Sequence, residues 1–540
     1  MGNDTAYDYI IVGSGFGGAV SALRLAEKGW RVALIEQGRR IDPGDIQRAK
    51  QKPSHLLWIP ELGLKSGYFA QQLFKHVAII GGVGLGGGSL VWAAVMLEPK
   101  DKFYDAPELA AMGIDWRKEL APHFATAKRM LGVAVNPYRS EQDALLEYTA
   151  RAMHVAQTFG RVPNAICFES EPGTDPYFDG AGPPRNPCTR CGGCMTGCAD
   201  NAKNSLDKNY LYFAEKAGVE ILTEWKADKI ESTEDQRYTV TLQPSRARGA
   251  SRTLSAGKVV LSCGVIGTLE LLMKNRDEYC TLPAVSPSLG RVVRTNSEAI
   301  TAVLHPRGVD MTKGTGVSSD FYPDEHTHVT QNRFDRGYRI IRYLYGPMTE
   351  GTRPVLRALH TLSKTLLSPR LMLRNWFCHD WEKRVTLFTV MQDLDNAVGF
   401  TYRKDWRRGF RRRLQSVADP QTKAPTYLKV ANDVARVYAT LAGGTAMSSF
   451  TESVGNRSTT AHILSGCPMG PDPSNAVIDS NHEVHGHPGL FVVDASSIPA
   501  NIGVNPSLTI TAMAERFGAL QPQREIESRG NPRCAGQNAK

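Results

Sequence analysis

Four cysteines follow one another at a spacing that can hold an inorganic cluster. Cys188, Cys191, Cys194 and Cys198 are separated by two, two and three residues, and thiolates at this spacing bind clusters such as [4Fe–4S] or [3Fe–4S]. Ala199 follows the last cysteine where bacterial ferredoxins have proline, and no second run supplies further ligands. A structural zinc site, redox-active CxxC thiols and unliganded cysteines therefore stay open as alternatives.

A second group of residues with chemical meaning opens the chain. An apolar run at residues 9–12 is followed by Gly13, Gly15 and Gly18 in the pattern GxGxxG, then by a stretch with helical spacing of apolar side chains, and Glu36 ends the next apolar run. In this order the glycines permit a tight turn, the approach of a pyrophosphate to the backbone, and close packing of a helix on a strand. The acid binds a ribose hydroxyl. The segment therefore predicts a dinucleotide site.

Another glycine-rich turn, at residues 81–90, reads GGVGLGGGSL and is denser in glycine than a hairpin needs. Glycine lets the backbone approach a ligand closely. The apolar residues 90–95 that follow favour a packed element over a flexible loop. We therefore expect this turn to run along an extended cofactor.

The elements that position these residues alternate in type along the chain. Short apolar strands that feed helices are expected near both ends of the sequence and in its middle, the pattern of a parallel sheet. Residues 1–105, 211–295 and 459–521 are predicted to build one discontinuous, Rossmann-like α/β domain for the nucleotide.

The intervening segments are predicted to form a second domain. Residues 106–210 and 296–458, which include the cysteine-rich loop 188–198, are expected to make an α+β substrate-binding domain over the cofactor. The tail, residues 522–540, is rich in Arg, Gly, Asn and Gln and is expected to be flexible.

Bulk properties limit the classes of protein. The 540 residues are 41% hydrophobic and 22% charged, which is typical of a globular protein. No stretch approaches the roughly 20 apolar residues that a membrane span needs. The first residues lack the basic and apolar regions of a signal peptide. A cytoplasmic location is therefore expected, with room for peripheral contact with a membrane.

Much of the positive charge, formally +10 overall, lies in residues 403–413, where aromatic residues alternate with arginines. No nucleic-acid recognition motif accompanies the run, so no nucleic-acid partner is expected. An anionic membrane surface and a solvated basic face both fit it. A second stretch, residues 355–376, mixes leucines with basic residues. It fits either an amphipathic cover over an apolar pocket or a helix that faces the core.

Several motifs together resemble the glucose-methanol-choline (GMC) family of flavin oxidoreductases. The resemblance spans nearly the whole chain and is closest to the cholesterol oxidase-like branch with a cysteine-rich insert, which residues 175–184 and 194–211 also resemble. The motifs are VGSGFGGAVSALRLAEKG (12–29), GLGGGSLVWAAVMLEPKDKFY (84–104), LSCGVIGTLELL (261–272) and FVVDASSIPANIGVNPSLTITAMAERF (491–517).

The resemblance implies FAD as the cofactor rather than a nicotinamide nucleotide. His462 occupies the catalytic histidine position of the family and Asn505 its catalytic asparagine position. Trp92 is a departure, because many relatives have asparagine there. The cofactor-binding residues implied by position are Gly13, Gly15, Phe16, Gly18, Glu36, Gly88, Ser89, Ala227, Asp494, Ala495, Asn505 and Pro506.

This assignment implies the oxidation of a secondary alcohol, sterol-like or otherwise bulky and apolar, by hydride transfer to flavin N5. His462 suits the hydroxyl proton because the pKa of histidine lies near working pH, and Asn505 can orient the substrate oxygen. In cholesterol oxidases a glutamate near the substrate also shifts the steroid double bond. Thr330 stands at that position and cannot act as a base, whereas Glu298 is a candidate to replace it.

The cysteine-rich loop leaves alternative functions and electron acceptors open. If residues 188–198 hold an iron–sulfur cluster, electrons leave through it to a quinone or protein acceptor, and the enzyme is a dehydrogenase of a sugar or another alcohol. Without a cluster, O₂ is the expected acceptor. The non-enzymatic alternative is a flavoprotein that senses redox state through these cysteines.

Overall fold

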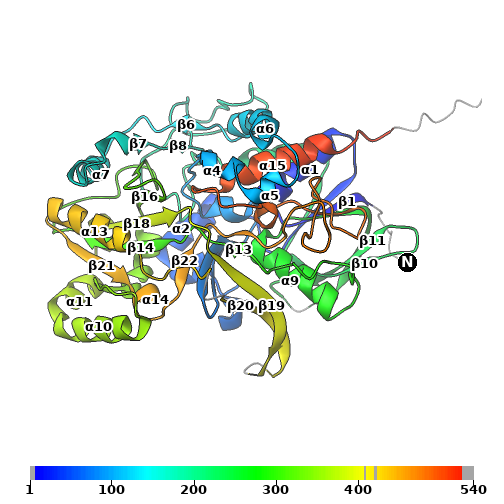
Figure 1. Cartoon of the computed structure of the whole chain (residues 1–540). Helices are drawn as coiled ribbons and strands as arrows, with labels where there is room; N and C mark the ends of the chain where they lie inside the picture. The colour runs from blue at the N-terminus through cyan, green and yellow to red at the C-terminus, as the bar shows by residue number, and fades with distance from the viewer. Residues whose placement is uncertain (1–6, 248, 407–408, 419–421, 526–540) are drawn as a thin grey trace, which may run out of the picture.

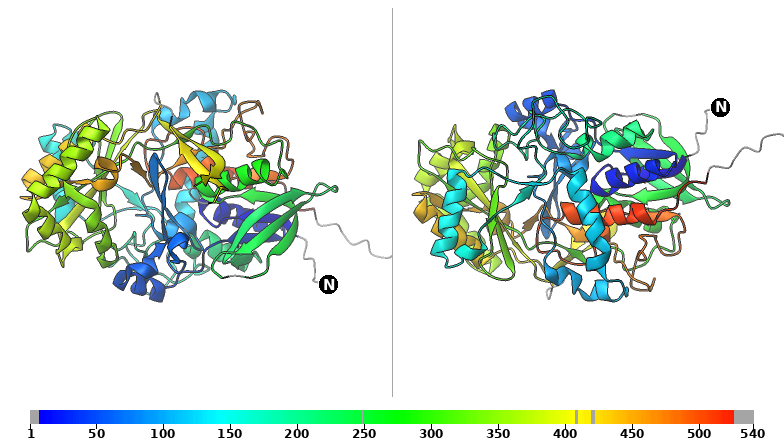
Figure 2. Two further views of the ribbon diagram at one scale, coloured as in Figure 1. Left: turned by 90° about the horizontal axis from the view of Figure 1, so that it is seen from below. Right: turned by 90° about the horizontal axis from the view of Figure 1, so that it is seen from above.

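The computed structural model describes residues 7–525 apart from 248, 407, 408 and 419–421. Two seven-stranded sheets dominate the described residues and lie at opposite ends of the molecule (Figures 1 and 2). One is largely parallel and contains the chain's first strand, and the other is antiparallel. The expected α/β class with a Rossmann-like sheet is confirmed.

The parallel sheet is built from three distant parts of the chain. Its strands are continuous apolar runs such as YDYIIV and VALIE, which suit a sheet that is covered on both faces. A long hairpin extends one edge in antiparallel fashion. In spatial order the strands are β10 (Trp225–Ser232), β11 (Tyr238–Pro244), β12 (Arg252–Leu261), β1 (Tyr7–Val12), β2 (Val32–Glu36) and β9 (Glu220–Thr223), and β24 (Leu490–Val492) pairs with β12.

Three helices pack side by side, and the first of them contacts β1 and β2 of this sheet. They are α1 (Phe16–Glu27), α15 (Ser507–Leu520) and α6 (Trp116–Met130), which run along the upper side of the molecule (Figures 1 and 2). Nearly every residue of α15 is buried, because the helix lies between the other two. A further helix, α9 (Gly264–Asp277), follows β12 and packs against β10.

The antiparallel sheet forms the other end of the molecule. Helices α13 (Lys429–Leu441) and α7 (Glu141–Ala152) pack together on one side of it, while α10 (Pro354–Leu367) and α11 (Pro369–Trp376) pack by its edge strand (Figure 1). In spatial order the strands are β17 (Tyr345–Pro347), β21 (Thr445–Ser449), β14 (Ala299–Leu304), β18 (Val385–Gln392), β16 (Thr327–Asn332), β15 (Ser319–Phe321) and β7 (Gly160–Arg161).

Two smaller sheets join these halves. In one, β22 (Ser458–Thr460) pairs with β5 (Val77–Gly82), which leads into the second glycine-rich turn, followed by β4 (Phe69–Leu73) and β3 (Leu57–Trp58). The other has the order β20 (Arg411–Val417), β19 (Ala397–Asp405), β13 (Val293–Arg294) and β23 (Leu464–Ser465).

Short elements complete the described chain. They are α2 (Pro43–Gln51), α3 (Pro53–Leu56), η1 (Pro60–Leu62), η2 (Gly87–Leu90), α4 (Asp101–Tyr104), α5 (Pro107–Ala110), β6 (Ala134–Val135), η3 (Ala156–Thr158), β8 (Pro163–Asn164), η4 (Leu206–Lys208), α8 (Tyr210–Lys216), η5 (Arg336–Leu344), α12 (Trp381–Arg384), α14 (Phe450–Ser453) and η7 (Ala495–Ser497).

The end of the described chain is held against the first helix. Of the tail predicted at 522–540, the carbonyl of Pro522 accepts a hydrogen bond from Trp30 Nε1 at 2.9 Å, and the Arg524 amide donates to the carbonyl of Lys28 at 3.0 Å. Residues 526–540 lie outside the described residues. No helix in the described part of the chain is both long and apolar enough to cross a lipid bilayer.

A buried acid connects α14 to the antiparallel sheet. Glu452 Oε1 accepts a hydrogen bond from the Ile300 amide of β14 at 2.9 Å, and its backbone carbonyl accepts one from Arg357 Nη2 at 3.1 Å. Because the side chain is removed from water, burial raises the pKa of Glu452 to about 8.

This raised pKa predicts a pH-dependent stability. Because Glu452 binds its proton more tightly in the folded state, its contribution is fully present below the unfolded pKa near 4.5 and is lost as the pH rises to about 8. The loss is about 1.4 kcal/mol per pH unit. Glu452→Gln should therefore raise the melting temperature relative to the parent, by an amount that grows between about pH 5 and pH 8.

Thermal denaturation across this pH range measures the effect. The control is Glu61→Gln, at an exposed acid in η1, which should leave the pH profile unchanged. If the difference in melting temperature between Glu452→Gln and the parent does not vary with pH, Glu452 titrates normally in the folded protein.

Candidate functional site

The glycines of the first loop have two different environments. Two of them lie against neighbouring backbone, and one faces open space. A Cβ atom on Gly13, whose φ is +100°, would lie 2.2 Å from the carbonyl oxygen of Ser262, and a Cβ on Gly18 would lie 1.9 Å from the carbonyl oxygen of Gly13. Nothing lies within 4 Å of the corresponding position on Gly15. The loop is therefore closed on its inner side and open at Gly15, where a pyrophosphate can reach the start of α1.

The second glycine turn lies against the first. A Cβ on Gly87 would be 2.9 Å from Gly15 Cα, while one on Gly88 would meet no atom closer than 4.0 Å, the ring of Phe16. Ser14 Oγ accepts a hydrogen bond from the Gly86 amide at 3.1 Å. The two turns predicted to bind the cofactor therefore border one open space.

Glu36 ends β2 beside this space, as the sequence predicts for the acid that binds ribose. Its Oε2 accepts hydrogen bonds from Ser14 Oγ at 2.6 Å and from the Ser14 amide at 3.2 Å, and its Oε1 accepts one from the Gly38 amide at 2.7 Å. Burial raises the pKa of Glu36, and these hydrogen bonds oppose the shift. The side chain is thus fixed at the rim of the dinucleotide loop.

Other predicted cofactor residues have structural partners. Ser89 Oγ donates to the carbonyl of Gly86 at 2.7 Å and accepts from the Leu206 amide at 3.1 Å, so it closes the second turn. Ala227 is buried on β10, next to a bulge between Ala227 and Lys229. These contacts shape the backbone along which a cofactor would lie.

The C-terminal motif is held by Asp494. Its Oδ2 accepts from Thr268 Oγ1 at 2.6 Å, and its Oδ1 accepts from the Ser496 amide at 2.7 Å. This carboxylate fixes the turn that begins at Ala495, the residue after it. Farther along the chain, Pro506 caps the N-terminus of α15 directly after Asn505.

A chain of three side chains forms the centre of the site. His462 Nδ1 lies 2.5 Å from Glu298 Oε1, and His462 Nε2 lies 3.0 Å from Asn505 Nδ2. Because a carboxylate only accepts and the asparagine amide donates, the hydrogen-bond network assigns the proton of neutral His462 to Nδ1. His462 Nε2 is then an acceptor on the side of Asn505.

Glu298 is the member of this chain that motif reading did not connect to His462. It is 2% exposed and also accepts from the Ala461 amide at 2.9 Å and from Thr460 Oγ1 at 3.2 Å. The sequence identified Glu298 only as a replacement for the missing base at Thr330. Thr330 itself lies on β16, where its hydroxyl donates to the carbonyl of Thr389 at 3.4 Å.

Two buried polar atoms at the predicted site have no partner among the described residues. They are Asn505 Oδ1 and Trp92 Nε1, and the Trp92 ring packs on Phe16 with ring centroids 4.9 Å apart. A buried group without a hydrogen bond is costly unless a ligand or water supplies one. The open glycine cradle and these atoms fit an extended, polar cofactor such as FAD, which the glycine loops, Glu36 and the segment 494–506 would hold.

The cysteine-rich loop does not fit an iron–sulfur cluster as arranged. In the part of the chain that the structure describes, no three His, Cys, Asp or Glu side chains lie close enough to hold a metal ion. Cys194 Sγ accepts from the Gly316 amide at 3.2 Å, Cys198 Sγ accepts from the Ala202 amide at 3.2 Å, and Cys191 is exposed. The metal-ligand prediction for Cys188, Cys191, Cys194 and Cys198 therefore receives no support from this geometry.

A buried lysine gives the loop a structural role instead. Lys203 Nζ donates to the carbonyl of Leu90 at 2.8 Å and to that of Cys194 at 2.7 Å. Burial lowers the pKa of Lys203 to about 8 and raises that of Cys188 to about 11. The loop is thus fastened to the end of the second glycine turn. Sequence reasoning missed Lys203, because a lone lysine carries no signal of burial.

Family models agree with this architecture. A model of the FAD binding domain matches residues 8–42, and two models described as GMC oxidoreductase match residues 181–275 and 380–514. The crystal structure of pyridoxine 4-oxidase from Mesorbium loti is similar in fold, with a TM-score of 0.63 at 16% identity over 95% of this chain and 98% of the other.

Whole-chain relatives define the family. A cholesterol oxidase of Acinetobacter baumannii is 37% identical over 97% of this chain and 95% of its own length. One of Mycobacterium tuberculosis (strain ATCC 25618 / H37Rv) is 38% identical over 97% of this chain and 93% of its own. With an open dinucleotide cradle and this similarity to whole-chain relatives, the protein belongs to the GMC oxidoreductase family and is an FAD-dependent alcohol oxidoreductase.

Proposed function

We propose that the protein oxidises a secondary alcohol of sterol-like or similarly bulky, apolar structure and passes the electrons to O₂. The observation that carries the proposal is the hydrogen-bonded chain Glu298–His462–Asn505, which ends on an unpaired amide oxygen beside the segment expected to contact the flavin. The names of the relatives at 37% and 38% identity, both cholesterol oxidases, support the substrate class.

His462 takes the hydroxyl proton in this proposal. The alcohol O–H bond breaks as its proton moves to His462 Nε2, the unprotonated ring nitrogen, and the carbinol C–H bond breaks as hydride leaves, so that a C=O bond forms. FAD, when bound, supplies the hydride acceptor at flavin N5. Asn505 Nδ2, which donates to His462 Nε2 at 3.0 Å, is placed to donate to the alcohol oxygen once the substrate occupies that space.

Glu298 positions His462 rather than acting as a second base. Its carboxylate holds the imidazole by Nδ1 and offsets the positive charge that develops when Nε2 is protonated, the arrangement of a carboxylate–histidine pair. Since three donors already occupy Glu298, it is poorly placed to carry a proton between carbon atoms. Double-bond isomerisation is therefore not part of the proposed activity.

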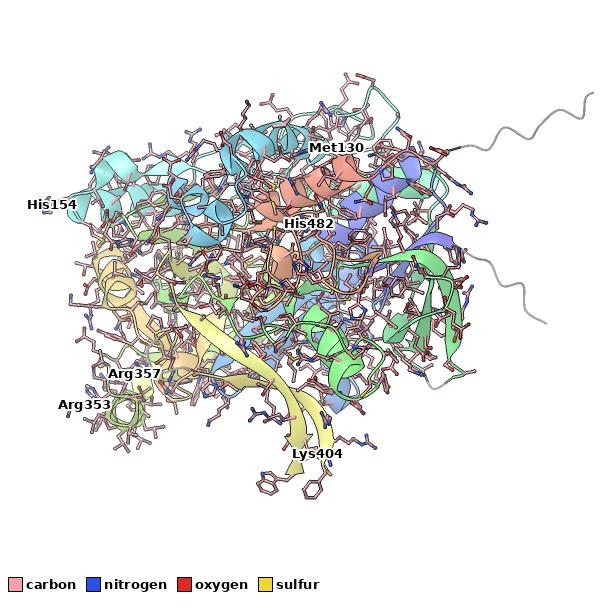
Figure 3. The ribbon with its side chains drawn as sticks, turned by 45° about the vertical axis from the view of Figure 1, so that its right-hand side comes forward. Met130, His154, Arg353, Arg357, Lys404 and His482 are labelled. Atoms are coloured by element: carbon pink, nitrogen blue, oxygen red, sulfur yellow. The ribbon has the colours of Figure 1, made fainter. Side chains whose placement is uncertain are left out.

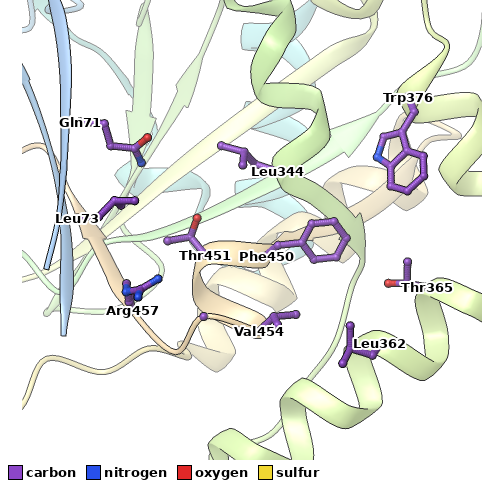
Figure 4. A pocket seen from close by; sticks show the side chains of 11 residues that line it. Gln71, Leu73, Leu344, Leu362, Thr365, Trp376, Phe450, Thr451, Val454 and Arg457 are labelled. Atoms are coloured by element: carbon purple, nitrogen blue, oxygen red, sulfur yellow. The ribbon is translucent and has the colours of Figure 1, made fainter. Parts of the chain in front are cut away.

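An open, mostly apolar cavity agrees better with a bulky apolar alcohol than with a sugar, although its lining includes neither His462 nor Asn505. It measures about 540 Å³ and lies between β4, α10 and α14 (Figure 4), within the usual range for small-molecule pockets. Its lining includes Leu344, Leu362, Trp376, Phe450 and Val454. Helix α14, which lines this cavity, is followed in the sequence by β22 and then by His462.

A water-insoluble alcohol reaches an enzyme from lipid, so peripheral contact with a lipid surface is part of the proposal. The sugar dehydrogenase with an iron–sulfur exit and the redox-sensing flavoprotein both depend on the cysteine loop. The hydrogen bonds of that loop to backbone groups favour neither alternative.

The proposed roles of His462 and Glu298 predict different losses in the rate of flavin reduction. His462→Ala should lower the rate of anaerobic flavin reduction by cholesterol in detergent by about 10²–10⁴-fold, because the proton acceptor is removed. Glu298→Gln should lower the limiting rate by about tenfold or more with little change in apparent affinity, because only the positioning of His462 is weakened. Stopped-flow absorbance of the flavin measures both.

Glu452→Gln is the matched control for Glu298→Gln, because Glu452 is also a buried acid but accepts a hydrogen bond from the Ile300 amide instead of His462. It should leave the reduction rate unchanged, and all variants should retain FAD. A His462→Ala enzyme that reduces its flavin at the parent rate would refute the role of His462.

The open glycine predicts loss of FAD without loss of fold. Gly15→Val places a side chain where no atom lies within 4 Å, so the chain should fold while the side chain blocks the pyrophosphate. Gly18→Val should instead disrupt folding, because its Cβ would lie 1.9 Å from a carbonyl oxygen. Flavin absorbance and circular dichroism of the purified variants distinguish the two, and a fully flavinylated Gly15→Val protein would contradict the assignment.

Metal analysis decides between the acceptors. Anaerobically purified protein should show flavin absorbance without stoichiometric iron or sulfide, and turnover should consume O₂ and form hydrogen peroxide in equal molar amount. Cys194→Ser should change neither the flavin absorbance nor the amount of hydrogen peroxide formed. Stoichiometric iron and sulfide, with no peroxide, would establish the dehydrogenase alternative.

A further inference from the structure

Helix α10 is oriented opposite to an ordinary surface helix. Its buried residues are Arg357 and Thr361, which are both polar, and the Arg357 guanidinium donates to Gly351, Thr426 and Asn456. A helix at the surface of a soluble domain normally buries its apolar side and exposes its polar side. Because the polar side of α10 is fixed inward by these hydrogen bonds, its leucines face outward.

The exposed apolar side chains lie on two helices that contact each other, α10 and α11. Leu366 and Leu367 are 81% and 82% exposed at the end of α10. A monomeric soluble protein rarely exposes so many large apolar side chains together. The members of this face, which we call the α10–α11 face, are Val355, Leu356, Leu359, Leu362, Leu366, Leu367, Leu373 and Phe377.

The charged side chains within the two helices of this face have one sign. Residues 353–377 contain no aspartate or glutamate. Arg353, Arg370 and Arg374 are exposed along the two helices. An apolar face with basic residues at its border is typical of helices that lie in the surface of an anionic bilayer, where long basic side chains reach the headgroups.

The basic hairpin β19–β20 projects from the same side of the molecule. Both α10–α11 and the hairpin extend from the lower side in Figure 1, and Figure 3 places Arg353 and Lys404 along that edge. Near the hairpin tip, Trp406 is 70% and Phe410 67% exposed, beside the exposed residues 411–413, all arginines. A second element with aromatic and basic side chains thus faces the same way.

We propose that the α10–α11 face and the β19–β20 tip together dock this protein on an anionic lipid bilayer, with Leu366 and Leu367 entering the apolar layer. Charge complementarity selects the bilayer as the occupant, because a second copy of the chain would bring like charges together at both elements. Leu362 belongs both to this face and to the lining of the apolar cavity. The cavity therefore borders the docked surface, where a lipid-borne alcohol arrives.

This inference rests on the proposed function, because docking would serve to deliver an apolar alcohol. Vesicle binding itself is measured without turnover. The FAD-loaded full chain is sedimented with vesicles of phosphatidylcholine alone or with phosphatidylglycerol. We expect binding to the mixed vesicles that weakens as salt is raised. The double variant L366E/L367E should bind about tenfold or more weakly.

The control is Leu62→Glu, at a leucine that is 72% exposed in η1, which should bind vesicles like the parent. The double variant R370E/R374E should lose the preference for anionic vesicles. All variants should keep their FAD and their rate with cholesterol dissolved in detergent, which shows that the fold is intact.

Two results would overturn the proposal. One is parent protein that does not sediment with either kind of vesicle. The other is a dimer by analytical ultracentrifugation that L366E/L367E separates into monomers, because the face would then be covered by a second copy. Loss of alcohol oxidation in a parent that still binds vesicles would refute the proposed function alone.

Discussion

The close approach of backbone at the start of α1 is the constraint on which the site depends. A Cβ on Gly17 would lie 1.7 Å from the carbonyl oxygen of Val493, so this position accepts only glycine. Val493 in turn receives a hydrogen bond from Ser262 Oγ at 2.7 Å. The dinucleotide loop, the end of β12 and the C-terminal segment therefore form one packed unit. Asn505, twelve residues after Val493, is consequently carried by the same backbone that shapes the cofactor loop.

The hydrogen-bonded residues Glu298, His462 and Asn505, which we propose to be catalytic, join this unit to the antiparallel sheet. Glu298 directly precedes β14, His462 follows β22, and Asn505 directly precedes Pro506, the N-cap of α15, so each residue is placed by a different element. A shift between the two halves of the molecule would break the contact of 2.5 Å between Glu298 and His462. The hydrogen bonds from Thr460 and Ala461 to Glu298 oppose such a shift, because they hold the backbone before His462 to the same carboxylate.

Sequence reasoning predicted what local spacing encodes and missed what only tertiary packing encodes. The GxGxxG run and the acid at Glu36 indicate their site because turn, helix and strand are consecutive in the chain. Glu298 and His462 are 164 residues apart, and no local pattern connects them. The cysteine spacing predicts a cluster only if the thiols converge, whereas two of these sulfur atoms instead accept backbone amides at Gly316 and Ala202.

Helix α10 is a second case in which the sequence predicts an element but not its tertiary contacts. Periodicity in residues 355–376 predicts an amphipathic helix, but it cannot state which side faces the protein. That choice is made by Arg357, whose guanidinium finds acceptors on three separate segments, at Gly351, Thr426 and Asn456. Burying an arginine is costly unless its charged end is hydrogen-bonded. The two Nη atoms of Arg357 make these hydrogen bonds, so they hold the polar side of α10 inward. The leucines are left outward as a consequence, and they are the residues that we propose enter the bilayer.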